Sequence, residues 1–161
     1  MQRRFLLLAL LPLAACAELR APRRPIPPPP GLLAGPDQGR QAIRELDAAF
    51  RNGAAALRGH PDRMARAAAI LEWLCTDLAS NPRWNPVSPG VKQVVYTARD
   101  EVRNALGIQP EVTGQEAASV MAQVARELAD GQEVRAQALL EDERRFRNGG
   151  ERVIARLRDP G

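Results

Sequence analysis

Residues 61–80 read PDRMARAAAILEWLCTDLAS, and this stretch decides the fold class. Its apolar residues recur at steps of three and four, which is the period of one face of an α-helix. They are Met64, Ala68, Leu71, Cys75 and Leu78. Ile70 and Leu74 widen the stripe, and Pro61 suits the first helical position because it has no N–H to leave unpaired. We therefore expect a central helix that packs against neighbours on two sides.

The segments before and after this stretch have the same helical period. From Asp37 onward the apolar positions are Ile43, Leu46, Phe50 and Leu57. Beyond a proline-rich loop at residues 81–89, Ser88 and Pro89 are typical of a helix start, and Gly107 is typical of its end. The apolar residues of that helix are Val91, Val94, Val95, Ala98, Val102 and Leu106.

Two further helix starts are predicted in the C-terminal third of the chain. Thr113 and Glu116 have the spacing of a capping box, and Asp130 and Glu133 repeat it. The second of these helices is expected to carry Leu139, Leu140 and Phe146, and to stop at Gly149-Gly150 before a short final helix. Sustained alternation of apolar and polar residues is missing from the sequence. We therefore expect an all-α protein: a small antiparallel bundle of about five to six helices over residues 37–161.

The N-terminus has the organisation of a secretion signal. Arg3 and Arg4 precede an uncharged run of 11 residues, FLLLALLPLAA, which is too short to span a membrane as a helix. The run ends in Leu13-Ala14-Ala15-Cys16. This segment resembles the lipobox of bacterial lipoproteins, in which the cysteine becomes the first residue of the mature protein. The alternative is an ordinary cleaved signal with an incidental cysteine.

The resemblance covers residues 1–16 and implies a signal peptide at 1–15 and a covalent lipid on Cys16. Several acyl chains hold a protein on a membrane stably, whereas one chain does so only marginally. In that family an alanine after the cysteine, as at Ala17, favours the outer membrane, with the protein facing the periplasm. We expect no other cofactor.

Residues 16–36 are expected to form the lipidated cysteine and a proline-rich linker. Pro27, Pro28, Pro29 and Pro30 are consecutive, and proline removes backbone donors and restricts φ. We expect a disordered, semi-rigid spacer of polyproline II type, up to about 60 Å long. The alternative is a proline-rich ligand for another domain.

The formal net charge of +4 comes entirely from residues 1–36. Five of the 23 basic residues and one of the 19 acidic residues precede Asp37, so residues 37–161 carry 18 of each sign. The basic residues Arg20, Arg23 and Arg24 lie beside the lipid anchor, where they suit anionic headgroups. A neutral domain gives no reason to expect nucleic acid as a partner.

The sequence lacks a recognisable catalytic or metal-binding arrangement. His60 and Cys75 are placed on one helix about 22 Å apart, too far for a nucleophile–base pair. Adjacent carboxylates such as Asp100 and Glu101 point in directions about 100° apart on a helix. A Cys/His zinc cluster is excluded by two cysteines and one histidine. We expect a protein that is not an enzyme, although an envelope hydrolase with a site assembled by the fold stays a third hypothesis.

Trp84 lies in the proline-rich loop and is the one candidate for a partner contact. Packing of this loop onto the bundle is the alternative, and we prefer it. The leading functional hypothesis is a lipid-anchored protein that binds another envelope component. The second is a periplasmic carrier of a small molecule or lipid, with a pocket between the helices. The sequence leaves the oligomeric state open.

Overall fold

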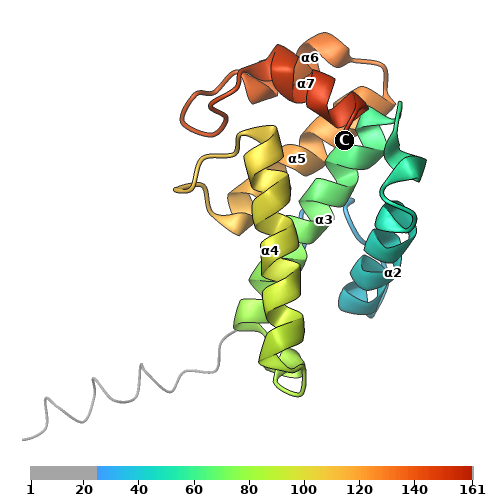
Figure 1. Ribbon diagram of the computed structural model, residues 1–161, viewed down its shortest axis with the longest axis vertical. Coiled ribbons are helices and arrows are strands. Elements are labelled where there is room, and N and C mark those ends of the chain that lie inside the picture. Colours follow the sequence, from blue (N-terminus) through green and yellow to red (C-terminus); the bar gives the residue numbers. More distant parts are fainter. Residues whose placement is uncertain (1–24, 161) are drawn as a thin grey trace, which may run out of the picture.

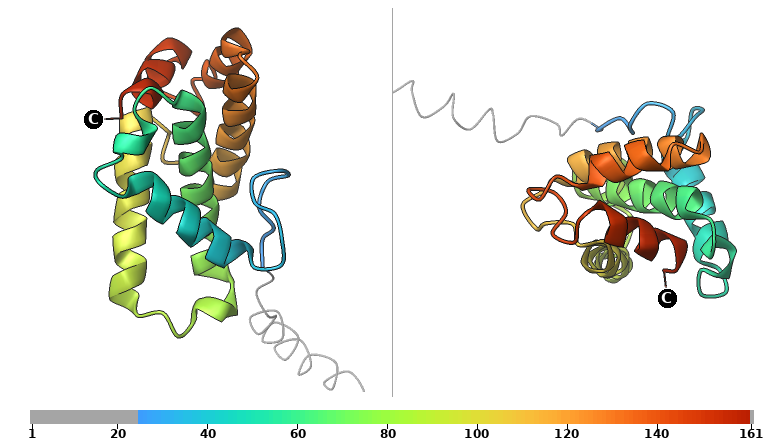
Figure 2. Two further views of the ribbon diagram at one scale, coloured as in Figure 1. Left: turned by 90° about the vertical axis from the view of Figure 1, so that its right-hand side faces the viewer. Right: turned by 90° about the horizontal axis from the view of Figure 1, so that it is seen from above.

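The computed structural model describes residues 25–160 (Figure 1, Figure 2). Within this range the regular structure consists of six α-helices and two short 3-10 helices, and one isolated bridge joins Ile108 and Phe146. The expectation of a small all-α helical bundle is confirmed. The lipobox residues Leu13, Ala14 and Ala15, together with Cys16, lie outside the described residues.

The helices follow one another with short connections. Their bounds are α2 Gln38–Phe50, η1 Ala55–Leu57, α3 Pro61–Ser80, η2 Pro82–Trp84, α4 Pro89–Leu106, α5 Gly114–Ala129, α6 Glu133–Leu140 and α7 Gly150–Arg158.

Helix α3 is the centre of the bundle, as residues 61–80 predicted. It packs against α2, α4, α5 and α7, and Figure 1 shows it between α2 and α4. Thirteen of its residues are buried, among them Leu71, Trp73 and Cys75. Two of the buried residues, Glu72 and Asp77, carry a charge and need partners inside the protein. The broad apolar stripe in the sequence therefore corresponds to a helix covered on more than one side.

Helix α4 begins and ends where the sequence indicates. The Ser88 hydroxyl accepts a hydrogen bond from the backbone N–H of Val91 at 3.4 Å, and Pro89 occupies the first turn. Gly107 ends the helix with φ of +70°, a left-handed conformation that costs glycine little. These local signals are reliable because they depend only on groups a few residues apart.

Three C-terminal expectations need correction. Thr113 accepts from the N–H of Glu116 at 3.2 Å, but the Glu116 carboxylate pairs with Arg145 at 2.7 Å instead of completing a capping box. The side chain of Asp130 does not cap α6, whose N-cap is Gln132. Phe146 lies beyond α6 and is buried against the bundle through the bridge to Ile108.

The second half of the proline-rich linker is part of the folded unit. Leu32 and Leu33 are buried, and Figure 2 shows this segment alongside the bundle. Side chains of α3 and α5 donate hydrogen bonds to its backbone carbonyls. These bonds are Trp73 Nε1 to Ile26 O at 2.9 Å, Gln115 Nε2 to Pro27 O at 3.2 Å and Arg126 Nη1 to Pro30 O at 2.9 Å. The predicted boundary at residue 37 is therefore too late, and residues 26–36 pack with the domain.

A candidate apolar docking groove

Helix α4 has an apolar face that the bundle leaves partly uncovered. Val91 and Val94 are 56% and 69% exposed, and Leu106 is the buried residue of this helix. The spacing of its apolar residues is that of a helix face packed on other helices. Val95 and Val102 are partly buried against the core, whereas Val91 and Val94 in the N-terminal half remain exposed.

A groove of about 670 Å³ lies between α2 and α4, above α3. Leu71 and Leu74 of α3 form its floor and are 5% and 4% exposed. The apolar residues of its two walls are Ile43, Leu46 and Phe50 of α2 and Val94, Val95, Ala98 and Val102 of α4. Because Ile43 is 47% exposed and Val94 is more so, the groove is open to solvent along its edges.

Two acidic residues, one on each wall, are the charged residues of this groove. Asp47 of α2 pairs with Arg51, and both side chains are more than half exposed. Glu101 of α4 makes no ion pair with any described residue and is exposed. The groove thus combines an apolar interior with acidic edges.

Trp84, the predicted candidate for a partner contact, is 9% exposed. Its Nε1 donates a 2.7 Å hydrogen bond to the buried carboxylate of Asp77, and the Arg83 guanidinium lies 4.6 Å from the centre of its ring system. A Cβ added at Gly39 of α2 would meet both Arg83 and Trp84, so the loop and α2 are in close contact. Trp84 packs the loop onto the bundle and is not an exposed anchor.

Cys75 and His60 are not brought together. Cys75 is 1% exposed, and its Sγ lies 3.7 Å from the backbone carbonyl oxygen of Val95. Burial raises the pKa of its thiol to about 12, so the thiol keeps its proton at neutral pH. His60 is exposed at the N-cap of α3 and makes no side-chain cap. This arrangement cannot activate a nucleophile.

The solvent-accessible carboxylates outside this groove are dispersed over the surface. Asp100 pairs with Arg99 at 2.8 Å, while its neighbour Glu101 lines the groove. Asp142 pairs with Arg145 on another part of the surface. Among residues 25–160, three or more His, Cys, Asp or Glu side chains do not gather in a way that would hold a metal ion.

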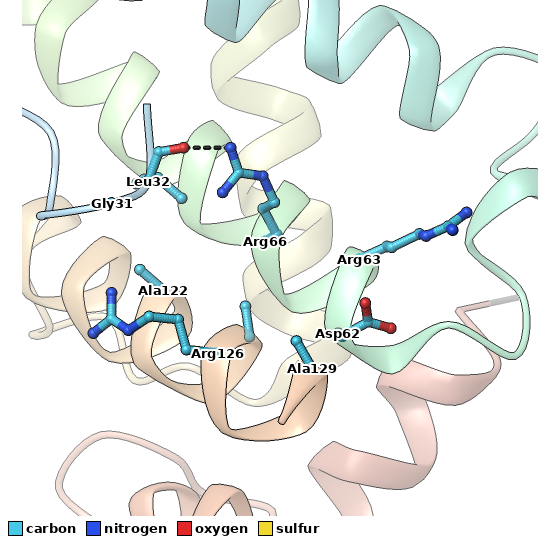
Figure 3. A pocket seen from close by; sticks show the side chains of 9 residues that line it. Gly31, Leu32, Asp62, Arg63, Arg66, Ala122, Arg126 and Ala129 are labelled. Atoms are coloured by element: carbon cyan, nitrogen blue, oxygen red, sulfur yellow. Dashed lines mark hydrogen bonds between the residues drawn. The ribbon is translucent and has the colours of Figure 1, made fainter. Parts of the chain in front are cut away.

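A second cleft, of about 150 Å³, is lined by three arginines of α3 and α5. Figure 3 shows that Arg63, Arg66 and Arg126 point in different directions, with Arg66 turned toward the carbonyl of Leu32. Arg66 also pairs with Glu45, and Arg126 is bonded to Pro30. Two of the three guanidinium groups therefore hold the proline-rich segment, and the three do not converge on a common anion.

Within the part of the chain that the structure describes, none of the helices has the length and apolar character needed to cross a membrane. Comparison of the sequence with known families, with curated proteins and with solved structures finds no match.

Proposed function

We propose that this protein is a non-enzymatic, lipid-anchored protein of the bacterial envelope. Its helical bundle binds a helical segment of another envelope protein in the groove between α2 and α4. The observation that carries the proposal is the pair of uncovered apolar walls, with Val94 and Ile43 exposed above a floor of buried leucines. Exposed apolar surface of this kind is typical of interaction sites.

A helix fits this groove better than a small molecule does. Ligand pockets enclose most of their ligand and place a few polar groups to orient it. Here the interior is apolar and the edges are open. Along α4 the lining runs from Val94 to Val102, a rise of about 12 Å, which is about two helical turns. An amphipathic helix laid in such a trough buries its apolar face and leaves its polar face in water.

The membrane anchor in this proposal is the lipid expected on Cys16. Since the segment from Ile26 onward is held on the bundle, residues 17–25 form the connection to the anchor. The ten steps from Cys16 to Ile26 reach about 31 Å at the polyproline II rise of about 3.1 Å per residue, which is about half the span expected from the sequence alone. The groove would then stay close to the membrane surface, which favours a partner that is itself at the membrane, in the outer membrane facing the periplasm.

The alternative is a carrier of a small molecule or lipid in the periplasm. A volume of about 670 Å³ with an apolar lining lies within the range of ligand pockets, and this favours an apolar ligand such as an acyl chain.

The test is photocrosslinking in intact cells with a photoreactive residue at position 94. The matched control is position 93 on the same helix, because Gln93 is exposed and adjacent helical positions diverge by about 100°. We expect protein adducts at 94 that map to one helical segment, that are missing at 93, and that disappear when Ile43→Asp puts a charge on the opposite wall. A lipid adduct at 94 would favour the carrier. Identical adducts at both positions would rule out the groove.

A further inference from the structure

We infer that the segment bound in the α2–α4 groove is an amphipathic helix with basic side chains along both edges of its apolar face. This rests on the proposed function and adds the chemistry of the partner. The deciding observation is that Asp47 and Glu101 lie on opposite walls, while the groove between them is lined by no arginine, lysine or histidine.

The positions of the two acidic residues favour basic residues on both edges of the bound helix. A helix lying over Leu71 and Leu74 presents one flank to α2 and the other to α4. Asp47 faces the first flank and Glu101 the second. Opposite charges across an interface select the partner and fix its orientation more than they add affinity. Acidic edges on the partner would place like charges together on both sides.

The two acids differ in how free they are to bind a partner. Asp47 already pairs with Arg51 at the C-cap of α2, so an incoming base must compete with that arginine. Glu101 makes no ion pair with a described residue. Glu101 is therefore expected to contribute more than Asp47 to the preference for a basic partner.

The basic edges extend over only part of the bound helix. A cleft of about 250 Å³ continues the groove toward α7 and shares Phe50, Glu101 and Val102 with it. Arg156 lines this continuation. The partner helix is therefore expected to carry its basic residues over the turns beside Asp47 and Glu101, and not beside Arg156.

The test compares three synthetic helical peptides that share one leucine stripe and differ only at the positions flanking it, which are lysine, glutamine or glutamate. Binding to the full chain held in phosphatidylcholine nanodiscs is measured by fluorescence anisotropy, and empty nanodiscs supply the blank. We expect affinity to fall in the order lysine, glutamine, glutamate. Each exposed ion pair is expected to contribute about a two- to fivefold change, which salt reduces.

The charge-reversal variant Glu101→Lys provides the decisive comparison. It should weaken the lysine peptide and strengthen the glutamate peptide, whereas Glu111→Lys, at an exposed acid in the loop between α4 and α5, should change neither. Equal affinities for the three peptides, all lost in Val94→Asp, would overturn the charge inference and leave the helix groove intact. Binding of none of them above the blank would count against both the groove and its charge preference.

Discussion

The guanidinium of Arg103 in α4 donates two hydrogen bonds to the carboxylate of Glu72 in α3. They run from Nε to Oε1 at 2.6 Å and from Nη2 to Oε2 at 2.8 Å, and the two side chains are 12% and 1% exposed. Arg103 also donates to the backbone carbonyl of Val112 at 3.0 Å, just before α5. This ion pair therefore ties α3, α4 and the α4–α5 connection together near the C-terminal end of α4.

Arg103→Leu is expected to lower the free energy of unfolding by about 3–5 kcal/mol, because it leaves Glu72 buried without its cation. Urea denaturation measures the change. The double variant Glu72→Met with Arg103→Leu should recover most of the loss, since two apolar residues replace the pair. Arg158→Leu removes a half-exposed pair with Glu133 and should cost at most about 1 kcal/mol. A double variant as unstable as the single one would contradict this.

The same carboxylate gives the stability a pH dependence. Burial raises the pKa of Glu72 above its ordinary value, and the Arg103 guanidinium opposes this effect without cancelling it. The folded state then binds the proton more tightly than the unfolded state. Stability from this group is greatest below the ordinary glutamate pKa and falls as the pH rises toward the raised one. Wild type should therefore lose stability relative to Glu72→Gln, which does not titrate, as the pH rises above about 4.5.

Trp84→Phe is expected to destabilise the protein by about 1–3 kcal/mol, because the buried Asp77 loses the donor at 2.7 Å and keeps only Asn81 at 3.0 Å. In a Trp73→Phe background, the remaining Trp84 fluorescence should be blue-shifted and poorly quenched by acrylamide. Quenching like that of free indole would restore Trp84 as an exposed partner contact.

Leu32→Ala should cost about 2–5 kcal/mol in urea denaturation, because Leu32 is 2% exposed and its loss opens a cavity beneath the proline-rich segment. Ala34→Ser, at an exposed position two residues later, should change the stability by no more than about 0.5 kcal/mol. A spacer that does not pack on the bundle would make both substitutions equally neutral.

Cys75 should be almost unreactive toward iodoacetamide in the folded protein. Its thiol pKa is raised from 9.0 to about 12 by burial, which lowers the thiolate fraction at pH 8 about a thousandfold. Mass spectrometry of Cys16→Ala protein, with and without urea, measures this single thiol. Because the folded thiol holds its proton more tightly, its contribution to stability is lost as the pH rises above 9. Equal labelling in both conditions would contradict the burial of Cys75.

Cys16→Ala tests the lipid anchor. We expect the variant to lose lipid labelling and to leave the membrane fraction, because the thiol that would carry the diacylglycerol is gone. Substitution of the neighbouring residue, Ala17→Ser, should retain both properties. If the Cys16→Ala variant still partitions with membranes, the lipobox resemblance does not describe this protein.

Sequence patterns that lie within one stretch of chain predict the helices and their ends correctly. The steps of three and four in residues 61–80 predicted α3, and Ser88 and Gly107 marked both ends of α4. Such signals depend on groups less than about two turns apart, so they need no knowledge of the rest of the fold. The capping interpretation of Glu116 failed because Arg145, 29 residues away, offers a stronger partner.

The amino-acid sequence by itself determined the helical class, the central helix and the neutral charge of residues 37–161. Only the tertiary structure decided which apolar faces are covered. The stripes of α2 and α4 look alike in the sequence, and whether Ile43 or Val94 is buried depends on how far the two helices stand apart on α3. The burial of Leu32, close to the four consecutive prolines, is likewise evident only from the tertiary structure. Periodicity records that a face is apolar, whereas the long-range packing of helices decides what, if anything, lies against it.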